Sequence, residues 1–132
     1  MATLVIDWDE AMQQCGDDEE FLRELLGDLR TETDTQMSQM EIIIQNPNDG
    51  NPFIQICRAA HVIKGAASNL MCGQLRQTAM ALETAATEPS KNPALLADVQ
   101  QRQLLLMDVH QKFINLKTAV QQYKDYLQSV GV

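Results

Sequence analysis

His61 and Lys64 are the residues of this 132-residue chain whose types and spacing best suit chemistry, and they stand in the sequence RAAHVIKGAASNL. On a helix, residues three or four apart are neighbours, so Arg58, Lys64, Gly65 and Ser68 fall on the same flank as His61. A neutral imidazole is a nucleophile near neutral pH. A lysine ammonium is a flexible point charge with three donors, which suits a phosphoryl oxygen. This flank is therefore the candidate site.

Gly65 is the informative residue of the flank. A glycine inside a helix costs roughly 1 kcal/mol relative to alanine, and its neighbours Ala66 and Ala67 are good helix formers. One turn after His61, the missing side chain bares the imidazole ring and leaves room for a bulky group on it. Two simpler explanations stay open at this point: the glycine allows close packing, and the histidine and lysine are ordinary solvated surface.

A further partner for His61 is expected across a helical hairpin. If two helices run antiparallel about a turn centred near Cys72, residues equidistant from that turn lie opposite each other. His61 is 11 residues before Cys72, and Glu83 is 11 residues after it. A carboxylate there accepts a hydrogen bond from the ring Nδ1–H, which leaves Nε2 unprotonated and nucleophilic. We predict that Glu83 orients His61, with a residue one turn away as the alternative.

Local signals divide the chain into five helical segments. Asp7 with Glu10 three residues on is a capping-box pattern that starts the first helix, and Gly16 ends it. Asp17 and Asp18 open the second helix. The boundaries expected further along are a stop at Asn46–Gly50, a start at Asn51-Pro52, a break near Met71–Gly73, a loop at Glu88–Asn92, and a last helix from Asn92-Pro93 to about Gln128.

These segments predict an all-α fold. Each long segment carries apolar residues at three-four spacing, and one amphipathic helix cannot bury its stripe alone. Four long helices with short connections indicate an antiparallel four-helix bundle, with the additional short N-terminal helix at one end. The length suits a single domain over residues 1–132.

Composition and charge exclude several classes of function. The chain has 10 basic and 18 acidic residues and a net charge of −8, so a general nucleic-acid binder with a concentrated basic face is not indicated, nor is docking on an anionic membrane. No apolar stretch approaches the roughly 20 residues that cross a bilayer, and the N-terminus lacks a signal-peptide pattern. Three cysteines without C-x-x-C spacing predict neither a disulfide framework nor a metal site.

The segment from His61 to Leu70, HVIKGAASNL, resembles the signature H-x-x-K-G-x-x-x-x-L of the histidine-phosphotransfer (HPt) domain. The N-terminal pattern D-x-x-x-A-x-x-x-x-G-D, here Asp7 to Asp17, and the acidic, leucine-rich helix after it are typical of the same family. The resemblance covers nearly the whole chain and implies a free-standing HPt protein. It implies a four-helix bundle with His61 as the phosphorylated residue, assisted by Lys64, Gly65 and Glu83.

The resemblance also implies partners and a reaction. His61 would accept a phosphoryl group from an aspartate in the receiver domain of a hybrid histidine kinase and pass it to the receiver of a response regulator. The expected partner-binding residues are Arg58, Val62, Ser68 and Asn69. No cofactor is expected on this chain, since the receiver would bring the Mg²⁺. The chain has no nucleotide-binding loop, so it is not expected to phosphorylate itself from ATP.

A monomer is expected, located in the cytoplasm and, in a eukaryote, also in the nucleus. The chain departs from the family pattern at Met71, where a glycine is usual. Three alternatives remain: a bundle that docks receivers without carrying phosphate, although such proteins usually lack the histidine; an adaptor that binds a partner helix around Val62, Ala66 and Asn69; and a metal or haem store. The metal or haem store is weakly supported, because the chain has only two histidines. The second of them, His110, is expected to be ordinary helix surface.

Overall fold

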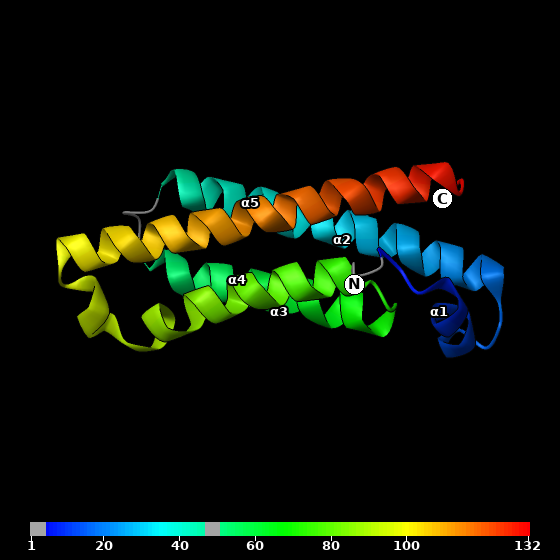
Figure 1. The fold of residues 1–132 in the computed structure, drawn as a ribbon, viewed down its shortest axis with the longest axis horizontal. Helices are drawn as coiled ribbons and strands as arrows, with labels where there is room; N and C mark the ends of the chain where they lie inside the picture. The colour runs from blue at the N-terminus through cyan, green and yellow to red at the C-terminus, as the bar shows by residue number, and fades with distance from the viewer. Residues whose placement is uncertain (1–4, 47–50) are drawn as a thin grey trace.

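The computed structural model describes residues 5–46 and 51–132, and within them every regular element is helical (Figure 1). The elements are α1 (Trp8–Gln14), α2 (Glu19–Gln45), α3 (Pro52–Asn69), α4 (Gly73–Lys91), the 3₁₀ turn η1 (Pro93–Leu96) and α5 (Val99–Ser129). The prediction of an all-α fold is thereby confirmed for the described residues. Of the turn-forming run expected after α2, only Asn46 is described; the remainder lies outside the described residues.

Three helices begin at the capping residues that the sequence indicates. The Asp7 side chain accepts from Glu10 N–H, the Asp18 side chain from Phe21 N–H, and the Asn51 side chain from Phe53 N–H. Each cap satisfies a backbone donor that the first turn of a helix leaves free. Pro52 occupies the first turn of α3, where its missing N–H costs nothing.

The boundary between α4 and α5 differs from the prediction. The expected loop Glu88–Asn92 is helical as far as Lys91, and the last helix starts at Val99 instead of Asn92-Pro93. Pro89 lies buried in the final turn of α4, where it removes one helix hydrogen bond, and the helix ends two residues later at Lys91. Pro93 opens the short turn η1, and the true N-cap of α5 is Asp98, whose carboxylate accepts from Gln100 and Gln101 N–H.

Each long helix packs against two of the other long helices. α3 and α4 share the most extensive contact and form a hairpin, while α5 lies along both α4 and α2 (Figure 1). Contacts between α2 and α5 run in opposite senses, since Lys124 pairs with Asp34 and Lys117 with Glu41. α3 also packs on α2, so His61 stands on a helix supported from two sides.

One apolar core joins all five helices. Phe53, Ile56 and Ile63 of α3 are fully buried with Leu22 and Leu26 of α2. Burying side chains of this size contributes roughly 1.5–3 kcal/mol each before the entropy of ordering them is counted. The remaining fully buried large side chains are Met40, Leu75, Leu82, Val109, Leu116, Tyr123 and Leu127.

Tyr123 has the largest fully buried side chain, and it is anchored by its hydroxyl. Its Oη donates a 2.7 Å hydrogen bond to the Leu26 carbonyl on α2, one of the bonds that joins α2 to α5. Burial is the main cause that raises the pKa of this phenol well above its usual value. The hydroxyl thus stays protonated and the bond persists across the physiological pH range.

The α3–α4 turn is tight and is tied to the N-terminal segment. Met71 has φ +57°, in the left-handed region where glycine is relaxed. Cys72 N–H donates to the Ala67 carbonyl and Asp7 N–H donates to the Met71 carbonyl. Methionine therefore adopts the backbone conformation that a glycine would supply here, and the turn that sets the α3–α4 register also holds the start of α1.

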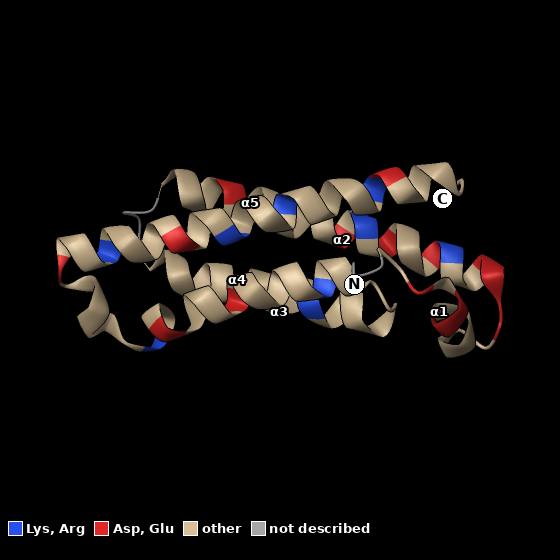
Figure 2. Ribbon diagram, in the orientation of Figure 1, with Lys and Arg blue, Asp and Glu red and all other residues tan. Residues whose placement is uncertain are grey.

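Acidic residues concentrate at one end of the molecule. Ten of the 18 acidic residues fall within residues 7–32, against two basic residues, Arg23 and Arg30. Figure 2 shows them over α1 and the first half of α2. Arg23 stacks over the Trp8 ring at 5.8 Å and joins α1 to α2. Among the described residues, no helix combines the length and apolar character needed to span a membrane.

Candidate functional site

His61 lies midway along α3 with its side chain open to solvent. The side chain is 68% exposed, and its Nδ1 lies 3.0 Å from Oε2 of Glu83 on α4. The two residues are 22 positions apart, at equal distance on either side of Cys72. The structure thus brings together the pair that the hairpin register predicts.

Glu83 also holds Lys64. The second carboxylate oxygen, Oε1, accepts a 3.0 Å hydrogen bond from Lys64 Nζ, so one carboxylate bridges the imidazole and the ammonium. Glu83 is only 19% exposed and Lys64 26%. Burial alone would raise the pKa of Glu83, but hydrogen bonds from Lys64 and His61, together with their charges, lower it below its usual value.

The ionised state of Glu83 decides which ring nitrogen of His61 carries the proton. An ionised carboxylate only accepts hydrogen bonds. Nδ1 must therefore be the protonated nitrogen, and in a neutral ring Nε2 then has a free lone pair. The arrangement leaves a nucleophilic nitrogen on a side chain that is mostly in solvent.

Gly65 leaves open space beside the ring. A Cβ built at Gly65 would meet nothing within 4 Å outside the local helix backbone, among the residues that the structure describes. Close packing therefore does not explain this glycine, which removes one of the two simpler explanations. The space that it leaves adjoins His61 on the exposed surface of α3.

Two hydroxyl groups brace the backbone beneath the pair. Ser68 Oγ donates to the Lys64 carbonyl at 2.8 Å, and Thr87 Oγ1 donates to the Glu83 carbonyl at 2.6 Å. Thr87 Oγ1 also lies 3.6 Å from Cys57 Sγ, which links α4 to α3 one turn from the site. Thr87 was not singled out from the sequence. The same mirror relation about Cys72 that pairs Glu83 with His61 pairs Thr87 with Cys57.

Two open grooves lie along the α2–α3 edge near His61, which itself lines neither of them. The first is lined by Arg58 and Val62, and the second by Ala66 and Asn69. The α2 side contributes Gln36, Gln39, Ile42 and Ile43 to the first groove and Phe21, Leu25, Asp28, Leu29 and Glu32 to the second. Three of the predicted partner-binding residues thus line a groove, whereas Ser68 lines neither. The α2 residues were missed because no motif marks them.

The second histidine lies apart from this site, and none of the three cysteines is in a disulfide. His110 is exposed on α5, beside a small cavity of about 160 Å³ where α5 meets the end of α2 and the start of α3. The three cysteines are free, and burial raises the pKa of the Cys72 thiol to about 12. Within residues 5–46 and 51–132, no group of three or more His, Cys, Asp or Glu is arranged to hold a metal ion.

Comparison with known protein families assigns the chain to one family. The model of the Hpt domain matches residues 24–126, from the first half of α2 to near the end of α5. The chain therefore belongs to the Hpt-domain family, and the resemblance seen in the sequence is confirmed. No curated protein and no solved structure gives a significant match.

Members of this family are phosphocarrier proteins of phosphorelay signalling rather than conventional enzymes, and they interact with receiver domains of response regulators and kinases. The matched residues include His61, Lys64, Gly65 and Glu83. They also include every residue that lines the two grooves except Gln14, Cys15 and Phe21.

Proposed function

We propose that His61 carries the phosphoryl group of a multistep phosphorelay and shuttles it between receiver-domain aspartates. The observation that supports this most directly is the side chain itself: it is 68% exposed, and its Nδ1 is held at 3.0 Å by Glu83. This leaves Nε2 as the reactive atom. Lys64 and Gly65 are proposed as the charge and the open space beside it.

The transfer step follows from this geometry. The Nε2 lone pair attacks the phosphorus of a receiver's aspartyl phosphate, a P–N bond forms, and the P–O bond to the aspartate breaks, which returns a free carboxylate. The ring keeps its Nδ1 proton and becomes cationic. Glu83 stabilises that charge at the distance already present. The reverse attack by another receiver's aspartate returns the ring to neutral.

Lys64 would assist by its charge. Its ammonium is held beside the ring through Glu83, within one helical turn of His61, and the bond to Glu83 leaves two of its three N–H donors for phosphoryl oxygens. Phosphoryl transfer depends mainly on positioning and charge stabilisation. Mg²⁺ is expected on the receiver, and no cofactor is proposed for this chain.

The grooves beside His61 are the proposed docking surface for the receiver. They place apolar Val62, Ile42 and Phe21 at the exposed surface, with Arg58 in one groove and Asp28 in the other. This mixture of exposed apolar side chains and opposite charges suits a specific protein contact. Asn69 belongs to the same surface, whereas Ser68 acts from beneath by bracing Lys64.

The scaffold and setting complete the proposal. The contacts of α2 with α3 and α5, and of α4 with α3 and α5, support an antiparallel four-helix bundle with α1 as an additional short helix. We propose that residues 1–132 form one domain, that one chain makes a complete site, and that no autophosphorylation from ATP occurs. We propose that the protein is located with its receivers in the cytoplasm, and also in the nucleus in a eukaryote.

Phosphoryl uptake tests the proposal. The protein is incubated with a labelled phosphorylated receiver, and uptake of acid-labile, base-stable label is measured for the wild type, His61→Gln and His110→Gln. We expect label on the wild type and on His110→Gln and none on His61→Gln. Equal labelling of His61→Gln would overturn the assignment of the carrier residue.

A second measurement separates transfer from docking. His61→Gln should still bind the receiver, because the grooves are intact, whereas Val62→Glu should bind more weakly and take up label more slowly. If the wild type binds receivers and takes up no label, the chain is a docking scaffold.

A further inference from the structure

The two grooves near His61 carry charges of opposite sign. Arg58 is the charged side chain of the first groove, whose other lining residues are amides and apolar groups. Asp28 and Glu32 are the charged side chains of the second groove, and no basic residue is among those that line it. The α2–α3 edge is therefore positive at one groove and negative at the other.

The two acids of the second groove have no cation beside them. Asp28 and Glu32 are four residues apart on α2, a spacing at which like charges destabilise a helix slightly. Both are exposed, and neither forms an ion pair within residues 5–46 and 51–132. The Glu32 carboxylate accepts only from the neutral amide of Gln36, at 2.9 Å. Both acids also lie past the first turn of α2, the part of a helix in which the dipole favours acids.

The acids in the second half of α2 are neutralised instead. Asp34 pairs with Lys124 at 2.6 Å and Glu41 pairs with Lys117 at 3.7 Å, both across to α5. Arg58 is like the groove acids, since no acidic side chain of the described part of the chain forms an ion pair with it. The three charges that line the grooves are thus available to a partner.

A partner that reaches His61 covers both grooves. Arg58 and Asn69 lie on either side of His61 along α3 and are about 16 Å apart, at about 1.5 Å per residue. A standard protein interface covers roughly 800 Å² per partner, which is about 30 Å across. A receiver whose aspartate meets the ring of His61 therefore meets the charges of both grooves in the same contact.

From this arrangement we infer that the two grooves form one polar docking surface that selects receivers by charge. The receiver that fits presents basic side chains to Asp28 and Glu32 and an acidic side chain to Arg58, beside apolar groups that pack in the grooves. A receiver turned through half a turn about His61 places like charges together, and these repel. The charges thus fix the orientation of the receiver. This inference rests on the proposed function, because transfer to His61 is what brings a receiver to this edge.

Charge reversal tests this docking surface and leaves the fold intact. Asp28→Lys puts a cation four residues from both Glu24 and Glu32, where opposite charges stabilise a helix, so α2 should be at least as stable as in the wild type. Titration calorimetry measures the affinity for a receiver domain that binds the wild type. Asp28→Lys and Arg58→Glu should each raise the dissociation constant about three- to tenfold at low salt, as when an exposed ion pair becomes two like charges. The effect should nearly vanish in about 1 M salt, where the screening length is about 3 Å.

Glu88→Lys is the matched control for Asp28→Lys. It makes the same change of charge at an exposed acid of α4 that lines neither groove, so it should bind the receiver like the wild type. Wild-type affinity in Asp28→Lys or in Arg58→Glu overturns the inference. An equal loss of affinity in Glu88→Lys also overturns it, because only the net charge would then matter.

Charge exchange on the receiver tests the orientation. Basic residues around its phosphoacceptor aspartate are changed to Glu one at a time, and each variant is titrated with Asp28→Lys and with Arg58→Glu. At least one change should strengthen the binding of Asp28→Lys and leave that of Arg58→Glu weak. If no change strengthens Asp28→Lys, or if the same change strengthens both, the inferred orientation is wrong.

The labelling of His61 separates this inference from the proposed function. A receiver that binds with this charge dependence and puts no label on His61 would refute the proposed transfer alone. Label on His61 from a receiver whose binding ignores the charges of Asp28 and Arg58 would refute the polar docking surface alone.

Discussion

Glu83 accepts a hydrogen bond from the His61 ring at 3.0 Å, and its other oxygen accepts one from Lys64 at the same distance. The imidazole and the ammonium therefore do not act independently. Lys64 helps to keep Glu83 ionised, Glu83 keeps the proton on Nδ1, and that leaves a lone pair on Nε2. The basic residue of the motif thus acts on the histidine through a carboxylate on the neighbouring helix.

Removing the Glu83 carboxylate tests this coupling. Glu83→Ala should slow phosphoryl uptake by about ten- to hundredfold, the loss that follows removal of a group that orients a metal-bound histidine. Glu83→Gln should lose less, because its amide oxygen still accepts one hydrogen bond. Nitrogen NMR of the ring should show mainly Nδ1–H in the wild type and a mixture of tautomers in Glu83→Ala. Glu88→Ala, an exposed change on the same helix, serves as the control; an unchanged tautomer in Glu83→Ala would refute the orienting role.

Stability should depend on pH through the same carboxylate. The pKa of Glu83 is lower in the folded chain than its ordinary value. Its contribution to folding is therefore present above the ordinary carboxyl pKa of about 4.3 and is lost as the pH falls through the lowered folded value. The difference in unfolding free energy between wild type and Glu83→Gln should be constant near neutral pH and shrink below about pH 4. Urea unfolding at several pH values measures it, and a difference that grows in acid would contradict the prediction.

Replacing Gly65 with alanine should raise the stability of the fold and slow phosphoryl transfer. Gly65→Ala should stabilise the fold by about 0.5–1 kcal/mol, because alanine is the better helix former and its methyl meets open space. It should also slow phosphoryl uptake, since the methyl occupies the space beside the ring. Gly27→Ala on α2 is the matched control, where the added Cβ meets only Val132 at 3.9 Å. The control should gain stability without loss of transfer, and equal transfer by both variants would mean that the open space is not used.

At Met71, in contrast to Gly65, glycine should be more stable than alanine. Met71→Ala and Met71→Gly both remove the half-buried side chain, but only glycine is relaxed at φ +57°. Met71→Gly should therefore be more stable than Met71→Ala by about 1 kcal/mol, the reverse of the order expected at Gly65. Thermal or urea unfolding of the pair measures this difference. Equal stabilities would show that the turn relaxes around the residue.

The parts of the fold that could be predicted from the sequence are those with local signals. Asp7 and the Asn51-Pro52 pair cap helices by contacts within three residues, and the tight turn before Gly73 fixes which residues of α3 and α4 face each other. The start of α5 was misplaced because Asn92-Pro93 carries the signature of a helix start and forms only a 3₁₀ turn. Asp98, the actual cap, follows without a distinguishing motif.

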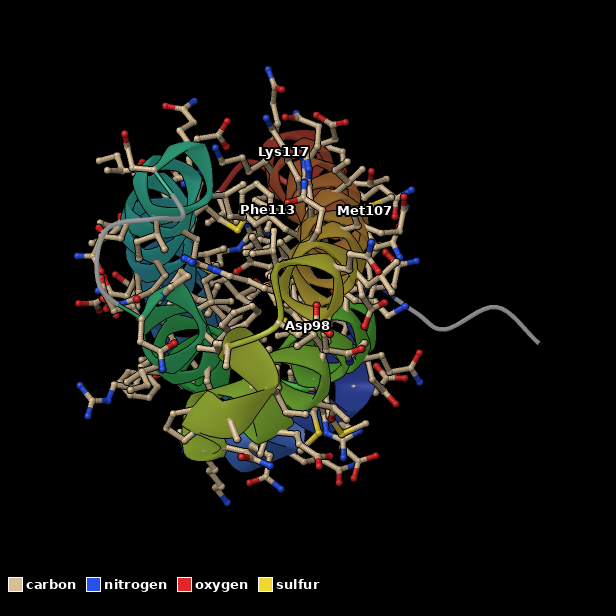
Figure 3. All side chains as sticks on the ribbon, turned by 90° about the vertical axis from the view of Figure 1, so that its left-hand side faces the viewer. Asp98, Met107, Phe113 and Lys117 are labelled. Carbon is tan, nitrogen blue, oxygen red and sulfur yellow. The ribbon has the colours of Figure 1, made fainter. Side chains whose placement is uncertain are left out.

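The rest of the site depends on contacts that no local pattern encodes. Lys64 reaches Glu83 rather than solvent because the hairpin brings the carboxylate within range of its flexible side chain. The grooves exist only where α2 meets α3, so Phe21 and Ile42 join Val62 through the packing of helices distant in sequence. On α5, Phe113 points toward the other helices and Met107 points away from them (Figure 3), and only the burial of Val109 and Phe113 shows which side of this helix faces the core.

The open position of His61 has a consequence for how long a carried group lasts. A side chain that is 68% exposed, with open space beside it at Gly65, would admit water as readily as a receiver. A phosphohistidine there would have no burial to protect it from hydrolysis. Its lifetime would rest on the intrinsic stability of the P–N bond, so the signal would persist only if encounters with receivers outpace that bond's decay.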